Sequence, residues 1–275
     1  MTTDVNRRVL PGFSLSLGYT LLYMSLLVAI PLAAGFLKAS HLSFSEFWAA
    51  IASERALAAY RLTVGASLAS AVINVGIGVL VAWVLVRYEF PLKGLLDSLV
   101  DLPFALPTAV AGLVYSDLFV ARGWYGRFLV PLGIQGAYSR LGIVLVLVFI
   151  GFPFVVRTLQ PVLEGLDKDV EEAAACLGAN RLQTALRVIF PSILPAVVTG
   201  FALAFARSLG EYGSVVFISG NMPFRTEIAP VLIVARLEEF AYTEATAIAV
   251  VLLTISFVTL FAINLLERWS KRHHG

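Results

Sequence analysis

The chain has 275 residues, of which 59% are apolar and 14% are charged, and its mean hydropathy is +0.87. These values lie outside the range of soluble domains and are typical of a polytopic membrane protein. The net charge of +2 comes without a clustered run of Lys and Arg, which argues against a nucleic acid partner. Cys176 is the single cysteine, and the three histidines, His41, His273 and His274, lack the spacing of zinc ligands, so we expect no disulfide and no metal site.

Six apolar stretches are candidates for membrane-spanning helices, since about 20 residues cross about 30 Å of hydrocarbon. The first is too long for the apolar core of a signal peptide, so we expect it to remain in place. The fold prediction is therefore an all-α polytopic membrane protein with six transmembrane helices. The predicted spans are roughly 13–37, 62–86, 102–120, 141–156, 193–219 and 243–266.

The distribution of Lys and Arg among the loops predicts the orientation of the chain. An even number of spans places both termini on one side, and the cytoplasmic side usually carries more positive charge. With a cytoplasmic N-terminus, that side receives eleven Lys and Arg residues and the other side eight. Arg268, Lys271 and Arg272 form the densest group. We therefore expect both termini to be cytoplasmic.

The third predicted span begins at a proline-containing segment, DLPFALP. Asp101 precedes Leu102 and Pro103 in the order of an N-cap followed by an early-helix proline. Pro103 and Pro107 predict a distorted helix start at the inner interface, which is tolerable where neighbouring helices satisfy the freed backbone groups.

Residues 157–195 form a polar interruption between the fourth and fifth predicted spans. Within 164–177, apolar residues recur at steps of three and four, as on one face of a helix. Gly178 then interrupts the pattern, Asn180 opens a second helix, and Pro191 marks the return toward the bilayer. The pattern predicts a helix, a tight bend and another helix that project from the membrane.

Two surfaces could receive this helix pair. An amphipathic pair can lie on the bilayer, but a helix on the membrane surface is usually basic. Residues 164–172 are net acidic and would be repelled by anionic lipids. The charge therefore favours a protein partner.

The same residues resemble the EAA loop of bacterial ABC importer permeases. Glu-Ala-Ala is followed after three residues by a glycine and after nine more by Val-Ile-Phe-Pro, where Val188 and Phe190 replace the usual Ile and Leu. The resemblance implies a coupling helix that inserts into a cleft of a cytoplasmic ATPase, and residues 157–195 are called the coupling segment below. The residues implied to couple are Glu172, Ala173, Ala174, Gly178, Val188 and Pro191.

Three further segments, 101–113, 152–164 and 207–221, and the opening RRVLPGFSLSLG resemble the T-type permease subunits of bacterial sulfate/thiosulfate importers. The resemblance implies a type I ABC importer permease (MetI-like) fold over 1–275 as a single domain in the bacterial inner membrane. The implied partners are a cytoplasmic ATPase dimer, a W-type permease subunit and a periplasmic sulfate/thiosulfate-binding protein. Molybdate permeases share a segment similar to RSLGE, so a molybdate or tungstate permease stays open. The choice between sulfate and thiosulfate stays open as well, as does pairing with a second copy of the chain.

Arg207 and Glu211 lie one helical turn apart in the fifth predicted span, with Ser208 and Ser214 near the same face. Ionisable groups at that depth are costly and usually face the bundle interior, paired or near water. Two interpretations stay open. The pair could fix one helix against its neighbours, or this face could line the anion path, with Arg207 offering charge-assisted hydrogen bonds and Glu211 keeping them weak enough for release.

The sequence contains no GxxxxGK[ST] motif, so we expect ATP to be used by a partner subunit and no cofactor to be bound by this chain. We also expect no catalytic residue, because Ser208 and Ser214 have no nearby His to form a nucleophile pair. A secondary transporter driven by an ion gradient is an alternative. It would be expected to show ionisable residues in several spans or an inverted repeat.

Overall fold

The computed structural model describes residues 12–273, and within that range the chain forms helices and turns without a strand. The all-α prediction is thus confirmed. Five helical runs are long and apolar enough to cross a membrane, and a sixth apolar helix is shorter. The five runs are Phe13–Ser40, Glu54–Arg87, Arg140–Glu164, Arg181–Leu209 and Tyr242–Ile263.

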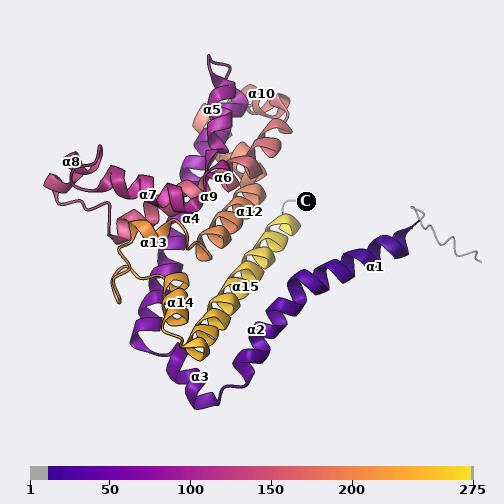
Figure 1. Ribbon diagram of the computed structural model, residues 1–275. Coiled ribbons are helices and arrows are strands. Elements are labelled where there is room, and N and C mark those ends of the chain that lie inside the picture. The colour runs from indigo at the N-terminus through magenta and orange to yellow at the C-terminus, as the bar shows by residue number, and fades with distance from the viewer. Residues whose placement is uncertain (1–11, 274–275) are drawn as a thin grey trace, which may run out of the picture.

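Three helices form the centre of the bundle: α4 (Glu54–Arg87), α9 (Arg140–Glu164) and α12 (Phe190–Leu209) (Figure 1). They approach closely because small residues lie where the helices cross. A Cβ atom added at Gly78 of α4 would lie 2.6 Å from Cγ1 of Val155 in α9, and one at Gly200 of α12 would lie 3.1 Å from the Cα of Val155. Val155 is itself fully buried.

The last two helices pack beside this centre. The long α15 (Tyr242–His273) contacts α12, and α14 (Ala229–Glu238) lies against both α15 and α4. The N-terminal run consists of α1 (Phe13–Met24), the π-helix η1 (Ser25–Ala29) and α2 (Ile30–Ser40), and it diverges from the bundle in Figure 1. It contacts α15 through α2, and α3 (Phe44–Ile51) leads from it into α4.

The third predicted span, 102–120, is not one continuous helix, and this part of the prediction was wrong. It is divided into α6 (Leu102–Ala105) and α7 (Thr108–Phe119), preceded by α5 (Lys93–Val100). Pro107 forces Leu106 into an extended conformation, with ψ of 131°, which ends α6. The 12 residues of α7 reach only about 18 Å, short of the hydrocarbon thickness.

Different short helices lie at the two ends of the bundle (Figure 1). The end where α5 and α10 (Lys168–Cys176) lie is called the coupling end, and the end where α3 and α14 lie is called the far end. Three further helices are short: α8 (Gly126–Leu129), the 3-10 helix η2 (Val130–Leu132) and α13 (Val215–Ile218).

Candidate functional site

The bend of the coupling segment follows from local backbone chemistry. Gly178 has φ of +84°, a conformation open to glycine but strained for other residues. Its N–H donates to the carbonyl of Ala175 at 2.9 Å, and the N–H of Ala179 donates to that of Ala174 at 3.0 Å. This is the Schellman pattern that ends a helix. The predicted end of α10 at Gly178 is therefore confirmed.

Asn180 starts the second helix as predicted. Its side-chain oxygen accepts from the backbone N–H of Gln183 at 2.9 Å, and the Gln183 side chain accepts from the backbone N–H of Asn180 at 2.9 Å. This reciprocal capping box satisfies two N–H groups that a helix start would otherwise leave unpaired. The bend between α10 and the next helix is thus held at both of its sides.

The second helix continues without a break past Pro191, the residue that the sequence pattern interpreted as the return toward the bilayer. α11 (Arg181–Thr184), the π-helix η3 (Ala185–Ile189) and α12 form one run, Arg181–Leu209. Pro191 stands at the start of α12, directly after the wider turn of η3, where its missing N–H is accommodated. Val188 lies within η3, and its carbonyl accepts from the Ser192 hydroxyl at 2.8 Å. The coupling segment therefore continues into the membrane as a single helix.

The outer surface of the coupling segment is mixed polar and apolar. Glu172, Ala173 and Gly178 are exposed, and Leu177 at the bend is 89% exposed. Leu182 of α11 adds a second exposed apolar side chain. Ala174 is buried, with only 8% of its surface exposed, so its expected contact with a partner is not available in this structure. The surface that a partner could reach therefore includes the Glu172–Ala173 edge, the bend and the start of α11.

An ion pair that local sequence patterns did not predict ties α10 to the bundle. At the end of α4, Nη2 of Arg87 lies 2.6 Å from Oε1 of Glu171 and donates to the carbonyl of Leu166 at 3.2 Å. The guanidinium also lies over the Trp83 ring, 5.5 Å from its centroid. The Arg87 side chain is only 11% exposed. Arg87 therefore holds the coupling helix against the end of a spanning helix.

A second arginine, Arg157 of α9, collects acceptors from the helices before α7. It donates to both carboxylate oxygens of Asp101, at 2.8 and 2.6 Å, and to Oδ1 of Asp97 at 2.6 Å. A hydrogen bond from the Gln160 amide is the main cause that keeps the pKa of Asp97 below its ordinary value, and Arg157 adds to it. This arrangement fixes α5 and α6 to α9.

Asp101 occupies the predicted N-cap position of α6, with Pro103 in the first turn, so the predicted helix start is confirmed. Its side chain makes no capping hydrogen bond within the described part of the chain, so that part of the N-cap prediction was wrong. The carboxylate pairs with Arg157 instead, in a bidentate contact that joins two oppositely charged groups.

Arg207 and Glu211 do form the predicted pair, but at the end of a helix and not inside it. α12 ends at Leu209, and Nη1 of Arg207 donates to Oε2 of Glu211 at 2.6 Å. The other carboxylate oxygen accepts from the backbone N–H of Ser214 at 3.0 Å and from its hydroxyl at 2.9 Å. Glu211 is 2% exposed, whereas 33% of the Arg207 side chain remains exposed. The carboxylate thus fixes the turn after α12, and part of the guanidinium still reaches the surface.

Ser208 does not join this cluster. It is 2% exposed and donates to the Ala204 carbonyl at 2.9 Å, and its hydroxyl lies 3.2 Å from that of Ser70 in α4. Ser208 therefore belongs to a contact between helices. The turn that carries Glu211 packs closely on α7 instead. The approach is so close that a Cβ atom added at Gly112 of α7 would overlap the carbonyl of Ser214.

Among residues 12–273, no group of three or more His, Cys, Asp or Glu side chains could hold a metal ion, and Cys176 is exposed. The polar clusters described above are ion pairs closed on themselves.

Comparison with known proteins identifies the family of the chain. The family model of the binding-protein-dependent transport system inner membrane component matches residues 74–272. The sulfate transport system permease protein CysT of Salmonella typhimurium (strain LT2) is 48% identical over 98% of both chains. The protein of the same name from Synechocystis sp. (strain PCC 6803) is 50% identical over 92% of this chain and 89% of its own length.

A solved structure with the same fold is that of a bacterial ABC transporter involved in the import of the acidic polysaccharide alginate. One of its chains superposes with a TM-score of 0.75 at 17% identity, over 93% of this chain and 94% of that chain. At this identity the likeness shows the fold, that of a type I ABC importer permease. The chain therefore belongs to the family of binding-protein-dependent transport system inner membrane components, which are multi-pass permeases of the inner membrane.

Proposed function

We propose that this chain is the permease subunit of an ATP-driven sulfate/thiosulfate importer, and that it forms half of the translocation path. Relatives named as sulfate permeases match nearly the whole chain at 48% and 50% identity, which supports sulfate as the cargo. The observation that carries the coupling role is the continuity of the Arg181–Leu209 helical run with an exposed bend at Leu177 and Gly178.

The first route for force runs along the backbone. A run of 29 residues is about 43 Å long, so a displacement at Arg181 is delivered to Leu209 without a flexible joint, apart from the wider turn at η3. Arg207 and Glu211 lie at the receiving end. A movement of the coupling segment therefore changes the position of this pair relative to α7.

The second route runs through side chains. Arg87 connects α10 to α4, and Arg157 connects α9 to Asp97 and Asp101. Both arginines lie near the coupling end, so a displaced α10 moves α4 together with α12. In this mechanism the bundle rocks as a body and is not pulled apart helix by helix.

The energy comes from outside the chain. A dimer of cytoplasmic ATPase subunits binds and hydrolyses ATP, and its clefts receive the coupling segment through Glu172, Ala173 and the bend at Gly178. A homologous W-type permease subunit completes the path, and a periplasmic sulfate/thiosulfate-binding protein delivers the anion. This arrangement requires both termini and the coupling end on the cytoplasmic side.

Along the path, Arg207 offers the anion a weak site. Glu211 already neutralises the guanidinium at 2.6 Å, and about a third of the arginine side chain is exposed. A dry, unpaired arginine would hold a divalent anion too tightly, and conduction requires sites that the anion can leave. In this mechanism the binding protein selects the anion, and the surface around Arg207 only lets it pass.

Gly178→Asp tests the coupling role. It adds a charge at the bend and imposes a left-handed conformation on a residue with a side chain, which costs about 1–2 kcal/mol. In proteoliposomes that contain the whole complex and the binding protein, we expect ATP hydrolysis to persist and sulfate uptake to fall.

Gly133→Asp is the matched control. Gly133 also has a positive φ, +78°, and open space around its Cβ position, but it follows η2 away from the coupling segment. The backbone strain and the added charge are therefore comparable. If the Gly178→Asp and Gly133→Asp complexes took up the same amount of sulfate per ATP hydrolysed, the docking role of the bend would be wrong.

A further inference from the structure

A cavity of about 450 Å³ opens between α4, the start of α9 and the loop before α14. Its volume falls within the range of about 300–1,000 Å³ typical of small-ligand sites. The chain segments that form it are far apart in the sequence, and Arg61, in the second turn of α4, places the cavity toward the far end. Its main lining residues are Arg61, Leu62, Gly65, Arg140, Val144 and Phe224.

The cavity is positively charged without a matching carboxylate. Neither Asp nor Glu is among its lining residues. Within the described residues Arg61 forms no ion pair and no side-chain hydrogen bond, and Arg140 uses only Nε, which donates to the Arg225 carbonyl at 2.9 Å. Both terminal nitrogens of Arg140 and the whole Arg61 guanidinium therefore remain available to a ligand.

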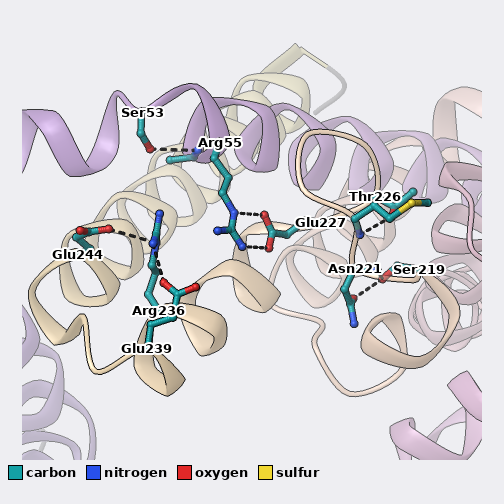
Figure 2. A network of polar contacts seen from close by, with 11 residues as sticks. Ser53, Arg55, Ser219, Asn221, Thr226, Glu227, Arg236, Glu239 and Glu244 are labelled. Atoms are coloured by element: carbon teal, nitrogen blue, oxygen red, sulfur yellow. Dashed lines mark hydrogen bonds and ion pairs between the residues drawn. The ribbon is translucent and has the colours of Figure 1, made fainter.

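Two other arginines in this part of the molecule are neutralised by carboxylates. Figure 2 shows Arg55 paired in bidentate fashion with Glu227, at 2.8 and 2.7 Å, and Arg236 held by Glu239 at 2.7 Å. Glu227 is 4% exposed, so Arg55 has a nearly buried acidic partner. The arginines of the cavity, in contrast, have no carboxylate partner. An anionic ligand can therefore take the position that Glu227 or Glu239 holds in these pairs.

The chemistry of the cavity defines the ligand. A guanidinium presents a planar set of N–H donors that fits two oxygens of a tetrahedral anion. The apolar walls of Leu62, Val144 and Phe224 lower the local dielectric and strengthen attraction to the two charges. We propose that the cavity binds a tetrahedral oxyanion, either sulfate on its way to the path or the phosphate of a lipid headgroup. The sulfate source rests on the proposed function, whereas the lipid source does not.

The test uses the purified complex of permease and ATPase subunits without the binding protein, in a maltoside detergent whose headgroup carries no phosphate. Sulfate binding is measured as the rise of Tm with added sodium sulfate, against sodium chloride at equal ionic strength. Retained phospholipid is counted by native mass spectrometry. The double variant Arg61→Gln/Arg140→Gln is compared with Arg122→Gln/Arg127→Gln, which removes the same charge from exposed arginines outside the cavity.

If the ligand is sulfate, its Kd rises about tenfold or more for each arginine lost, as expected for charge-assisted hydrogen bonds. If the ligand is a lipid, the count of retained phospholipids falls in the cavity variant and stays unchanged in the control. A cavity variant that matches its control in both measurements overturns the proposal. Sulfate uptake by the unmodified complex separately tests the proposed function, so the two failures are distinguishable.

Gly65→Phe gives an answer that does not depend on charge. Nothing lies within 4 Å of a Cβ atom added at Gly65, so the helix tolerates a side chain there, and that side chain fills the cavity. We expect this variant to fold and to lose the same ligand as the double arginine variant, and Arg61→Lys to retain part of the binding. Full binding in Gly65→Phe would also overturn the proposal.

Discussion

The contact between Arg87 and Glu171 offers the most direct test of the proposed force transfer from α10 to α4. Glu171→Gln removes the carboxylate charge and leaves Arg87 with the Leu166 carbonyl and the Trp83 ring. Exposed pairs contribute about 0.2–1 kcal/mol, but the Arg87 side chain is 11% exposed and that of Glu171 30%. For a pair so largely removed from water, we estimate a loss of about 1–2 kcal/mol. This corresponds to about a 5- to 30-fold shift toward an undocked α10.

The measurement is the number of ATP molecules hydrolysed per sulfate taken up by proteoliposomes with the complete complex. We expect Glu171→Gln and Arg87→Gln each to raise this ratio several-fold. The double variant should be no worse than the more severe single one, because both remove the same interaction. The charge swap Arg87→Glu/Glu171→Arg should restore part of the coupling. Asp169→Asn is the control, since it removes an exposed carboxylate of the same helix.

Additive effects of the two single variants would refute this reasoning. The arginine and the glutamate would then act independently, and α4 would not move through their contact. An unchanged ratio in all three variants would leave the α11–α12 helical run as the route for force.

Three further outcomes follow from the geometry. Arg207→Ala should reach the membrane but lower sulfate uptake about tenfold or more, and unchanged uptake would remove its role in the path. Gly112→Val should lower the stability of the complex by about 1–3 kcal/mol because the added side chain overlaps the turn after α12, whereas Gly76→Val, with open space at its Cβ position, should lower Tm far less. The pKa of Asp97 is lowered mainly by the Gln160 hydrogen bond, so its stabilising effect is present above the ordinary value of 3.8 and is lost as pH falls through the lower folded value. The Tm difference between wild type and Asp97→Asn should therefore be constant at about pH 5 to 8 and shrink in more acidic solution, and a change near neutral pH would contradict the assignment.

The spans were predictable where hydropathy alone defines a helix, and not where a local break competes with it. The apolar residues Val215–Ile218 extended the predicted fifth span to 219, although α12 ends at Leu209 and the turn that follows is fixed by Glu211. In the same way, hydropathy joined α6 and α7 across Pro107. Both errors arise because a hydropathy average carries no information about where the backbone leaves the helical conformation.

The coupling segment was predictable in its local features because capping and helix-ending signals lie within a few residues of one another. Gly178 ends the first helix and Asn180 starts the second, as the sequence predicted. The contacts that attach this segment and its neighbours to the bundle were not predictable in this way. Arg157 and Asp101 are 56 residues apart, and Ser70 and Ser208 are 138 residues apart. No helical periodicity relates such positions. Only the packing of α5 and α6 on α9, and of α12 on α4, brings them together.

The length of α4 has a consequence for how the protein sits in a bilayer. Its 34 residues reach about 51 Å, against about 30 Å of hydrocarbon. Even a steep tilt of about 40° leaves about 39 Å along the bilayer normal, so the helix must emerge into the headgroup region. With the helix centred in the bilayer, its charged termini, Glu54 and Arg87, both lie beyond the acyl chains. A thicker bilayer would draw Arg87 toward the lipid tails, so membrane thickness itself becomes a variable that tunes how firmly the bundle holds α10 through the contact of Arg87 with Glu171.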